Sequence, residues 1–104
     1  MIREKRKHDR LDLEDLPARI HRVEDGAEVD FCPMNVSPTG MAILCSNHLS
    51  VGAEIILSLD EQEIKMTVRW CQPKDNDPGV FRVGLETIDP SIQLDEIIKE
   101  QLTF

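Results

Sequence analysis

Apolar and polar residues alternate most regularly in the stretch Glu63-Ile64-Lys65-Met66-Thr67-Val68-Arg69-Trp70. Successive side chains of a β-strand point to opposite faces of the sheet, so this period of two predicts a half-buried strand. The pattern places Ile64, Met66, Val68 and Trp70 toward a core and leaves Arg69 on the other face. The sequence therefore indicates a sheet with one buried side.

Other short strands are expected on both sides of this stretch. Turn signals separate them at Asp25-Gly26, Ser37 to Gly40, Ser50 to Gly52, Asp60 to Glu63 and Asp75 to Gly79. The expected strands are 18–23, 27–34, 41–45, 54–59 and 80–87, with Ile55, Leu57 and Leu59 sharing one face and Phe81, Val83 and Leu85 another. Six strands joined by hairpins close most simply into a small antiparallel barrel.

After Thr87 the period changes from that of a strand to that of a helix. Asp89-Pro90 offers an N-cap followed by proline at the first helical position. Leu94, Ile97, Ile98 and Leu102 then fall on one stripe. The fold class predicted is therefore an all-β dominated, six-stranded antiparallel β-barrel with a C-terminal α-helix over about 90–102, lying across an open end or face of the barrel.

Composition excludes several classes of protein. The chain has 104 residues, enough for one domain, and a net charge of −8, which argues against nucleic acid polymers and anionic membranes. No run of eighteen apolar residues and no apolar leader is present, so we expect a cytoplasmic protein without direct membrane insertion. The three cysteines, Cys32, Cys45 and Cys71, form no CxxC pair, so we expect neither a disulfide framework nor a metal site.

Positive charge is concentrated in the first ten residues. They hold five of the twelve Lys and Arg residues against two acids, whereas the other 94 residues hold seven bases and eighteen acids. Arg6 and Arg10 are four positions apart, and the rigid donor fork of arginine bonds a phosphate or the O6 and N7 of guanine in bidentate fashion. We expect 1–10 to form a flexible arm ahead of a barrel domain at 11–104. The plainer alternative is a solvated terminus that only aids solubility.

A second polar motif is Asn35-Val36-Ser37-Pro38-Thr39-Gly40. As structure alone, Ser37 to Gly40 fits a β-turn, which Asn35 would start by an Asx-turn. As a ligand site, Asn35 can donate and accept at a base edge and Ser37 offers a hydroxyl. Gly40 would let the backbone approach a ligand closely. The motif by itself supports both readings.

Taken together, the two motifs carry a family resemblance. Arg6-x-x-x-Arg10 followed about 25 residues later by Asn35-x-Ser37-x-x-Gly40 resembles the PilZ domain family, bacterial receptors for the second messenger cyclic di-GMP. Val68-Arg69-Trp70 and the segment 82–86 also stand where the family has similar features. The resemblance implies a split-barrel fold. It implies that Arg6 and Arg10 reach the phosphates and guanine edges, and that Asn35, Ser37 and Gly40 surround one guanine. Auxiliary candidates are Lys5, Lys7, His8 and Arg69.

The function implied is ligand-dependent signalling. Cyclic di-GMP would order the arm against the Asn35–Gly40 turn, and an unidentified protein partner would read the new surface. The main alternative is a ligand-independent PilZ-like module that works through protein contacts. A barrel for single-stranded nucleic acid needs stacking aromatics and a basic groove, which four aromatic residues and this charge do not provide. No cofactor is expected, and no spacing of histidine and cysteine suggests a nucleophile with its base, so an enzyme is not expected.

Overall fold

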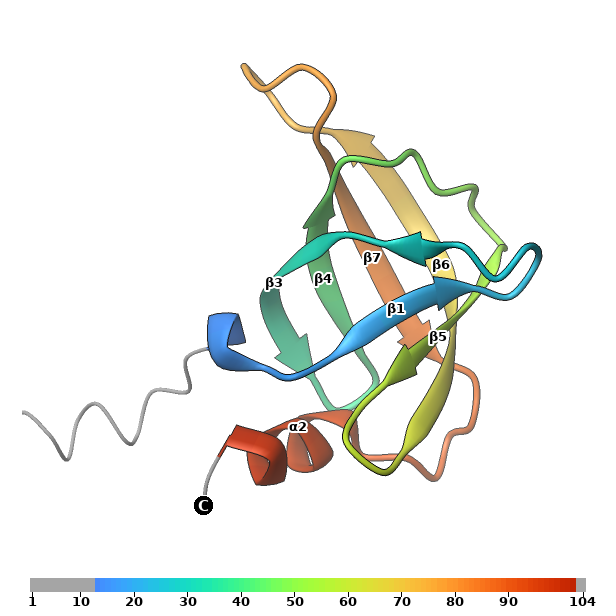
Figure 1. The fold of residues 1–104 in the computed structure, drawn as a ribbon, viewed down its shortest axis with the longest axis vertical. Coiled ribbons are helices and arrows are strands. Elements are labelled where there is room, and N and C mark those ends of the chain that lie inside the picture. Colours follow the sequence, from blue (N-terminus) through green and yellow to red (C-terminus); the bar gives the residue numbers. More distant parts are fainter. Residues whose placement is uncertain (1–12, 103–104) are drawn as a thin grey trace, which may run out of the picture.

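The computed structural model describes residues 13–102, which form one curled sheet and two helical segments (Figure 1). The elements are η1 (Leu13–Asp15, a 3-10 turn), β1 (Arg19–Arg22), β2 (Glu28–Val29), β3 (Phe31–Ser37), β4 (Gly40–Cys45), β5 (Glu54–Ser58), β6 (Glu63–Pro73), β7 (Phe81–Thr87) and α2 (Leu94–Leu102). The strand order is β2-β1-β5-β6-β7-β4-β3, and all the pairings are antiparallel. The predicted strand-dominated barrel with a C-terminal helix is confirmed.

The strand count is seven instead of the predicted six, because the segment expected to be one strand is divided at Asp30. Its first part, β2, pairs with β1, and its second part, β3, pairs with β4. β2 and β3 therefore stand at opposite ends of the strand order, although they follow each other directly in the chain. The continuous backbone through Asp30 thus joins the two ends of the sheet and curls it into a barrel.

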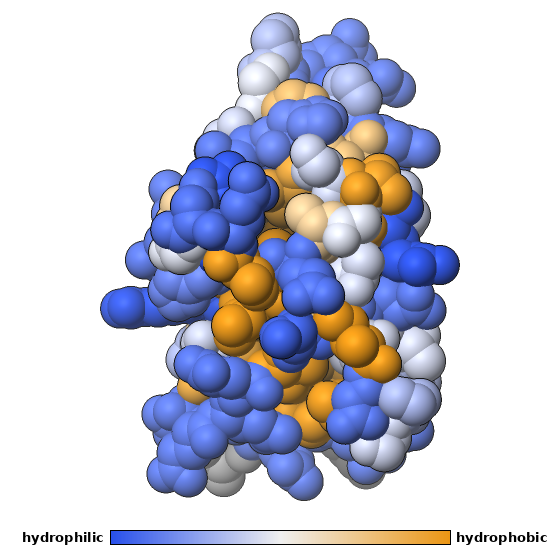
Figure 2. Space-filling view, turned by 90° about the vertical axis from the view of Figure 1, so that its right-hand side faces the viewer, coloured by the Kyte–Doolittle hydropathy of each residue, from blue (hydrophilic) through white to orange (hydrophobic). Residues whose placement is uncertain are grey.

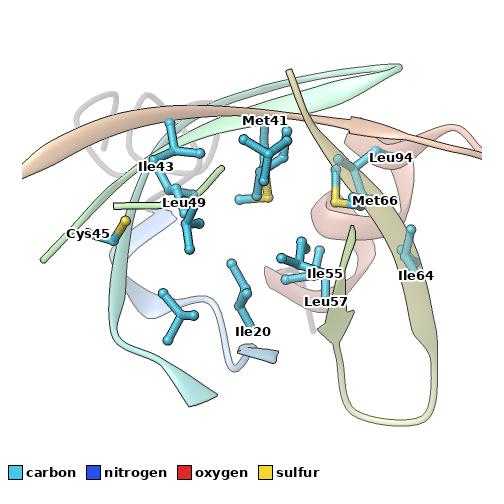
Figure 3. Packing of buried hydrophobic residues seen from close by; sticks show 14 of the residues in the cluster. Ile20, Met41, Ile43, Cys45, Leu49, Ile55, Leu57, Ile64, Met66 and Leu94 are labelled. Carbon is cyan, nitrogen blue, oxygen red and sulfur yellow. The ribbon is translucent and has the colours of Figure 1, made fainter. Parts of the chain in front are cut away.

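The inward faces of the strands form an aliphatic core (Figure 3). The alternation in β6 is confirmed for Ile64, Met66 and Val68, which are at most 1% exposed. The same holds for Ile55 and Leu57 of β5, which have no exposed surface. Each fully buried side chain of this size contributes about 1.5–3 kcal/mol. Among residues 13–102 no polar or charged residue is buried, so burial of aliphatic side chains holds this fold together.

Trp70 departs from the alternation. The register between β6 and β7 shifts after Val68, so that Val68 lies opposite Leu85 and Trp70 lies opposite Gly84. Arg69 is the extra residue of this β-bulge, and one extra residue exchanges the two faces of the strand beyond it. The prediction that Trp70 points inward is therefore wrong. Its side chain lies on the outer face, where the residue is 39% exposed.

The helix α2 lies at one end of the barrel, as predicted (Figure 1). Leu94 and Ile98 are buried, and the other two residues of the expected stripe pack against the core. The helix begins at Leu94, four residues later than expected, because Asp89 makes a local turn instead of an N-cap. Its carboxylate accepts hydrogen bonds from the N–H and the hydroxyl of Ser91, at 2.9 and 2.8 Å.

On the face seen in Figure 2, hydrophilic residues lie around the margins and hydrophobic residues show between them near the middle. No helix within residues 13–102 has the length and apolar character needed to cross a membrane.

Candidate functional site

A pocket of about 360 Å³ is open on the outer face of the sheet, over β3, β4, β7 and β6. Its floor consists of three small residues, Gly40, Ala42 and Gly84. Cross-strand pairing places Ala42 of β4 directly opposite Gly84 of β7, so two neighbouring strands both lack a large outward side chain at this point. Small residues at these outward positions therefore contribute to the hollow.

One wall of the pocket contains Asn35 and Ser37, which lie on β3 at the end of the sheet. The structure thus brings together the three residues of the Asn-x-Ser-x-x-Gly motif. Ser37 and Gly40 pair across the tight turn predicted from the sequence, and the Ser37 hydroxyl donates to the Gly40 carbonyl at 3.3 Å. Asn35 lies within β3 and pairs with Ala42, so its side chain faces the pocket instead of opening the turn.

The turn between β3 and β4 is fixed to the rest of the domain. The Thr39 carbonyl accepts hydrogen bonds from the backbone N–H and the hydroxyl of Thr87, at 2.8 and 3.2 Å. The Pro38 carbonyl accepts one from the N–H of Leu94, the first residue of α2, at 2.9 Å. The wall that carries the motif is therefore held in place by β7 and by the start of the helix.

The opposite wall is produced by the β-bulge in β6, which places both Arg69 and Trp70 on the outer side. Arg69 Nε and Glu86 Oε1 form an ion pair at 3.0 Å, and both side chains are about half exposed. Arg69 was an auxiliary candidate in the sequence, and it does line the pocket. The sequence did not identify Trp70 and Glu86 as pocket residues. The bulge that moves Trp70 outward has no clear sequence signature, and Glu86 reaches the pocket only through the pairing of β7 with its neighbours.

Gly84 is the residue that would have pointed to Trp70. A Cβ at Gly84 would fall on the indole ring, so the tryptophan lies directly against the glycine backbone. Glycine inside a strand often marks such a close approach. Gly40 has a related structural role, since a Cβ there would fall on the carbonyl oxygen of Leu85 in β7. Its small size is therefore required by strand packing, whatever it does for a ligand.

The charge of the described pocket is balanced. Arg69 is the cation and Glu86 the anion among its lining residues, and they are paired. The other basic candidates, Lys5, Arg6, Lys7, His8 and Arg10, lie outside the residues that the structure describes. Within 13–102 no group of His, Cys, Asp and Glu side chains is arranged to hold a metal ion. The pocket is thus a polar hollow with one aromatic wall, suited to a flat heterocycle with hydrogen-bonding edges.

Comparison with known families agrees with this geometry. Residues 4–104 match the family model described as PilZ domain. The chain belongs to the PilZ domain family. The matched range covers the positions from Arg6 to Gly40. PilZ domains are receptors and adaptors for cyclic di-GMP, and the family is not a catalytic one. No curated protein and no solved structure matches the chain.

Proposed function

We propose that this PilZ domain binds cyclic di-GMP, with one guanine in the outer pocket and the phosphates held by Arg6 and Arg10. The observation that carries the proposal is the meeting of Asn35, Ser37 and Gly40 in one open pocket that also contains Arg69 and Trp70. Guanine offers a flat face and edges with both donors and acceptors, and this pocket offers an aromatic ring and polar side chains on two walls.

Each wall has a role in this proposal. The Asn35 amide can both donate to and accept from a base edge, and the Ser37 hydroxyl adds a second adjustable partner. The Trp70 indole covers Gly84, and beside it the small Ala42 side chain leaves room for a planar ring close to the backbone. The indole of Trp70 provides a surface for stacking, which contributes about 1–3 kcal/mol per base in other aromatic sites.

The phosphates require charge that the described walls do not supply. The ligand carries two negative charges, whereas the one arginine among the described lining residues already pairs with Glu86. Arg6 and Arg10 supply two guanidiniums at the spacing of the family motif. Ordering the arm costs roughly 1–2 kcal/mol per residue, so a net affinity in the micromolar range, about −8 kcal/mol, is expected.

The signal in this proposal is the surface formed by the docked arm and the ligand, which an unidentified protein partner recognises. Removing residues 1–10 should abolish ligand binding and leave the thermal unfolding of the ligand-free domain nearly unchanged. Equal binding by the shortened chain would contradict the role of the arm.

The second candidate function is a ligand-independent protein interaction module. The observation that favours it is that the described lining residues of the pocket carry no net charge to attract a dianion.

Isothermal titration calorimetry with cyclic di-GMP distinguishes the two functions. We expect saturable binding by the wild type, a loss of at least about tenfold in Arg6→Ala, Arg10→Ala and Asn35→Ala, and no binding of GTP. Arg19→Ala is a matched control, because Arg19 is exposed on β1 and does not line the pocket. Heat no larger than that of dilution would favour the ligand-independent module.

A further inference from the structure

We infer that the Arg69–Glu86 pair selects guanine over adenine in this pocket, an inference that rests on the proposed function. The two side chains come from neighbouring strands, β6 and β7, and both line the pocket. Their contact joins Arg69 Nε to Glu86 Oε1 at 3.0 Å. This ion pair involves one nitrogen of the guanidinium and one oxygen of the carboxylate. Further donors of Arg69 and the second oxygen of Glu86 can therefore bond a ligand.

Side by side, the pair presents a donor and an acceptor. The Watson–Crick edge of guanine has the complementary order, with the O6 acceptor beside the N1–H and N2–H donors. Adenine has the reverse order, with the N6–H donors beside the N1 acceptor. Guanine can thus bond both members of the pair, whereas adenine would place donor against donor and acceptor against acceptor. When the wrong base is bound, donors and acceptors of the site are left without partners, and the affinity for that base is lower.

The position of the pair fits a base that spans the pocket. Asn35 and Ser37 lie on β3, and Arg69 lies on β6, with β4 and β7 between them. Three strand spacings of roughly 4.8 Å separate these walls by about 14 Å along the sheet. The Trp70 indole covers Gly84 within this width, and a purine stacked on the indole lies between the two walls. One edge of the base then faces Asn35 and Ser37, and the other faces Arg69 and Glu86.

Glu86 is also the one carboxylate among the described lining residues. Asn35 carries no charge, so it is a weaker acceptor than a carboxylate for the guanine N–H groups. A carboxylate beside a dianionic ligand is unfavourable unless it accepts hydrogen bonds from the base. Removing its charge therefore has opposite effects under two explanations. If Glu86 bonds guanine, binding weakens, and if Glu86 only restrains Arg69, binding strengthens.

The test compares two cyclic dinucleotides, cyclic di-GMP and cyclic di-AMP, on the full chain and its variants. Glu86→Gln should lose roughly tenfold or more in affinity for cyclic di-GMP and lose nothing for cyclic di-AMP, so the preference for guanine narrows. Glu54→Gln is the matched control. Glu54, Thr67 and Glu86 lie in one cross-strand row, and Glu54 does not line the pocket. This control removes an equal charge from the same row and should leave both affinities unchanged.

A second variant addresses the donor half of the pair. Arg69→Lys keeps the positive charge and removes the planar fork, and it should narrow the preference in the same way. Circular dichroism and unfolding midpoints show whether each variant is folded before its affinity is measured. Unchanged or tighter binding of cyclic di-GMP by folded Glu86→Gln overturns this inference and leaves the proposed function standing. Absence of binding by the wild type overturns the proposed function itself, and this inference with it.

Discussion

The two faces of β4 and β7 carry side chains of very different size. On the inner face, Ile43 and Val83 lie opposite each other and have no exposed surface. One residue away on the outer face, Ala42 and Gly84 lie opposite each other and form the floor of the pocket. The same two strands therefore carry the core and the candidate site in alternate residues.

This difference separates stability from binding along a single strand. Large aliphatic residues on the inner face fill space, whereas small residues on the outer face leave room for another group, which at Gly84 is the Trp70 indole. Substitutions on the inner face should change the free energy of unfolding, and substitutions on the outer face should change ligand affinity. The exceptions are positions where a missing side chain also allows two segments to approach each other, as at Gly40 and Gly84.

The largest expected effect is on the inner face. Ile43→Ala should lower the free energy of unfolding by about 2–5 kcal/mol, because it leaves a cavity in a core with no exposed surface at this position. Urea denaturation measures the change. Arg82→Ala, an exposed residue of β7, is the control and should change stability by less than about 0.5 kcal/mol. Equal losses of unfolding free energy in the two variants would contradict the conclusion that the inner face determines stability.

A smaller loss is expected at Gly40, where the outer face meets the packing of two strands. Gly40→Ala should cost about 1–3 kcal/mol, because the new Cβ falls on a backbone carbonyl of β7 and the strands must move apart. Gly84→Ala should cost less, because its Cβ meets the Trp70 side chain, which can rotate into solvent. Denaturation of the two variants in parallel tests this order, and a larger loss at Gly84 would contradict it.

The third effect is confined to binding. Trp70→Ala should weaken binding of cyclic di-GMP by about 1–3 kcal/mol and change stability little, since the side chain is partly exposed. Gly84→Ala should weaken binding through displacement of the indole, so it should have no further effect in the Trp70→Ala background. Calorimetry on the two single variants and the double variant measures the coupling. Independent, additive losses would mean that the glycine does not act through Trp70.

The sequence predicted the inner face well and the outer face only in part. Alternation in β6 correctly placed Ile64, Met66 and Val68, because burial of a whole strand face repeats over many residues. Trp70 was misplaced, since a single extra residue at Arg69 reverses the alternation and no local residue preference announces it. The division of a predicted strand at Asp30 was missed for a similar reason. It depends on which strands the two halves pair with across the barrel.

The pocket itself was half predicted. The motif residues Asn35, Ser37 and Gly40 were found because they lie within six positions of one another in the chain. Glu86 and Trp70 come from other strands, and only the register of the sheet brings them to the same hollow. A sequence motif records residues that act together locally. It does not record the partners that a curled sheet adds from a distance of thirty residues or more.

The smallest expected effect lies in the β1–β2 hairpin, away from the pocket. The Ala27 N–H and the Arg22 guanidinium bond the Asp25 carboxylate at 3.0 and 2.8 Å, and they hold the pKa of Asp25 below its usual value. A lowered pKa in the folded state means that this carboxylate stabilises the fold above the unfolded value, about 3.9. That contribution is lost as the pH falls through the lower, folded pKa.

Asp25→Asn should therefore unfold at a slightly lower urea concentration than the wild type near neutral pH, and the difference should shrink below a pH of about 4. Glu24→Gln removes an equal charge from the same turn and controls for net charge. A difference that grows in acid would contradict the assigned hydrogen bonds. Because the hairpin does not line the pocket, Asp25→Asn should leave the affinity for cyclic di-GMP unchanged. A change in this affinity would show that the hairpin and the pocket are coupled through the barrel.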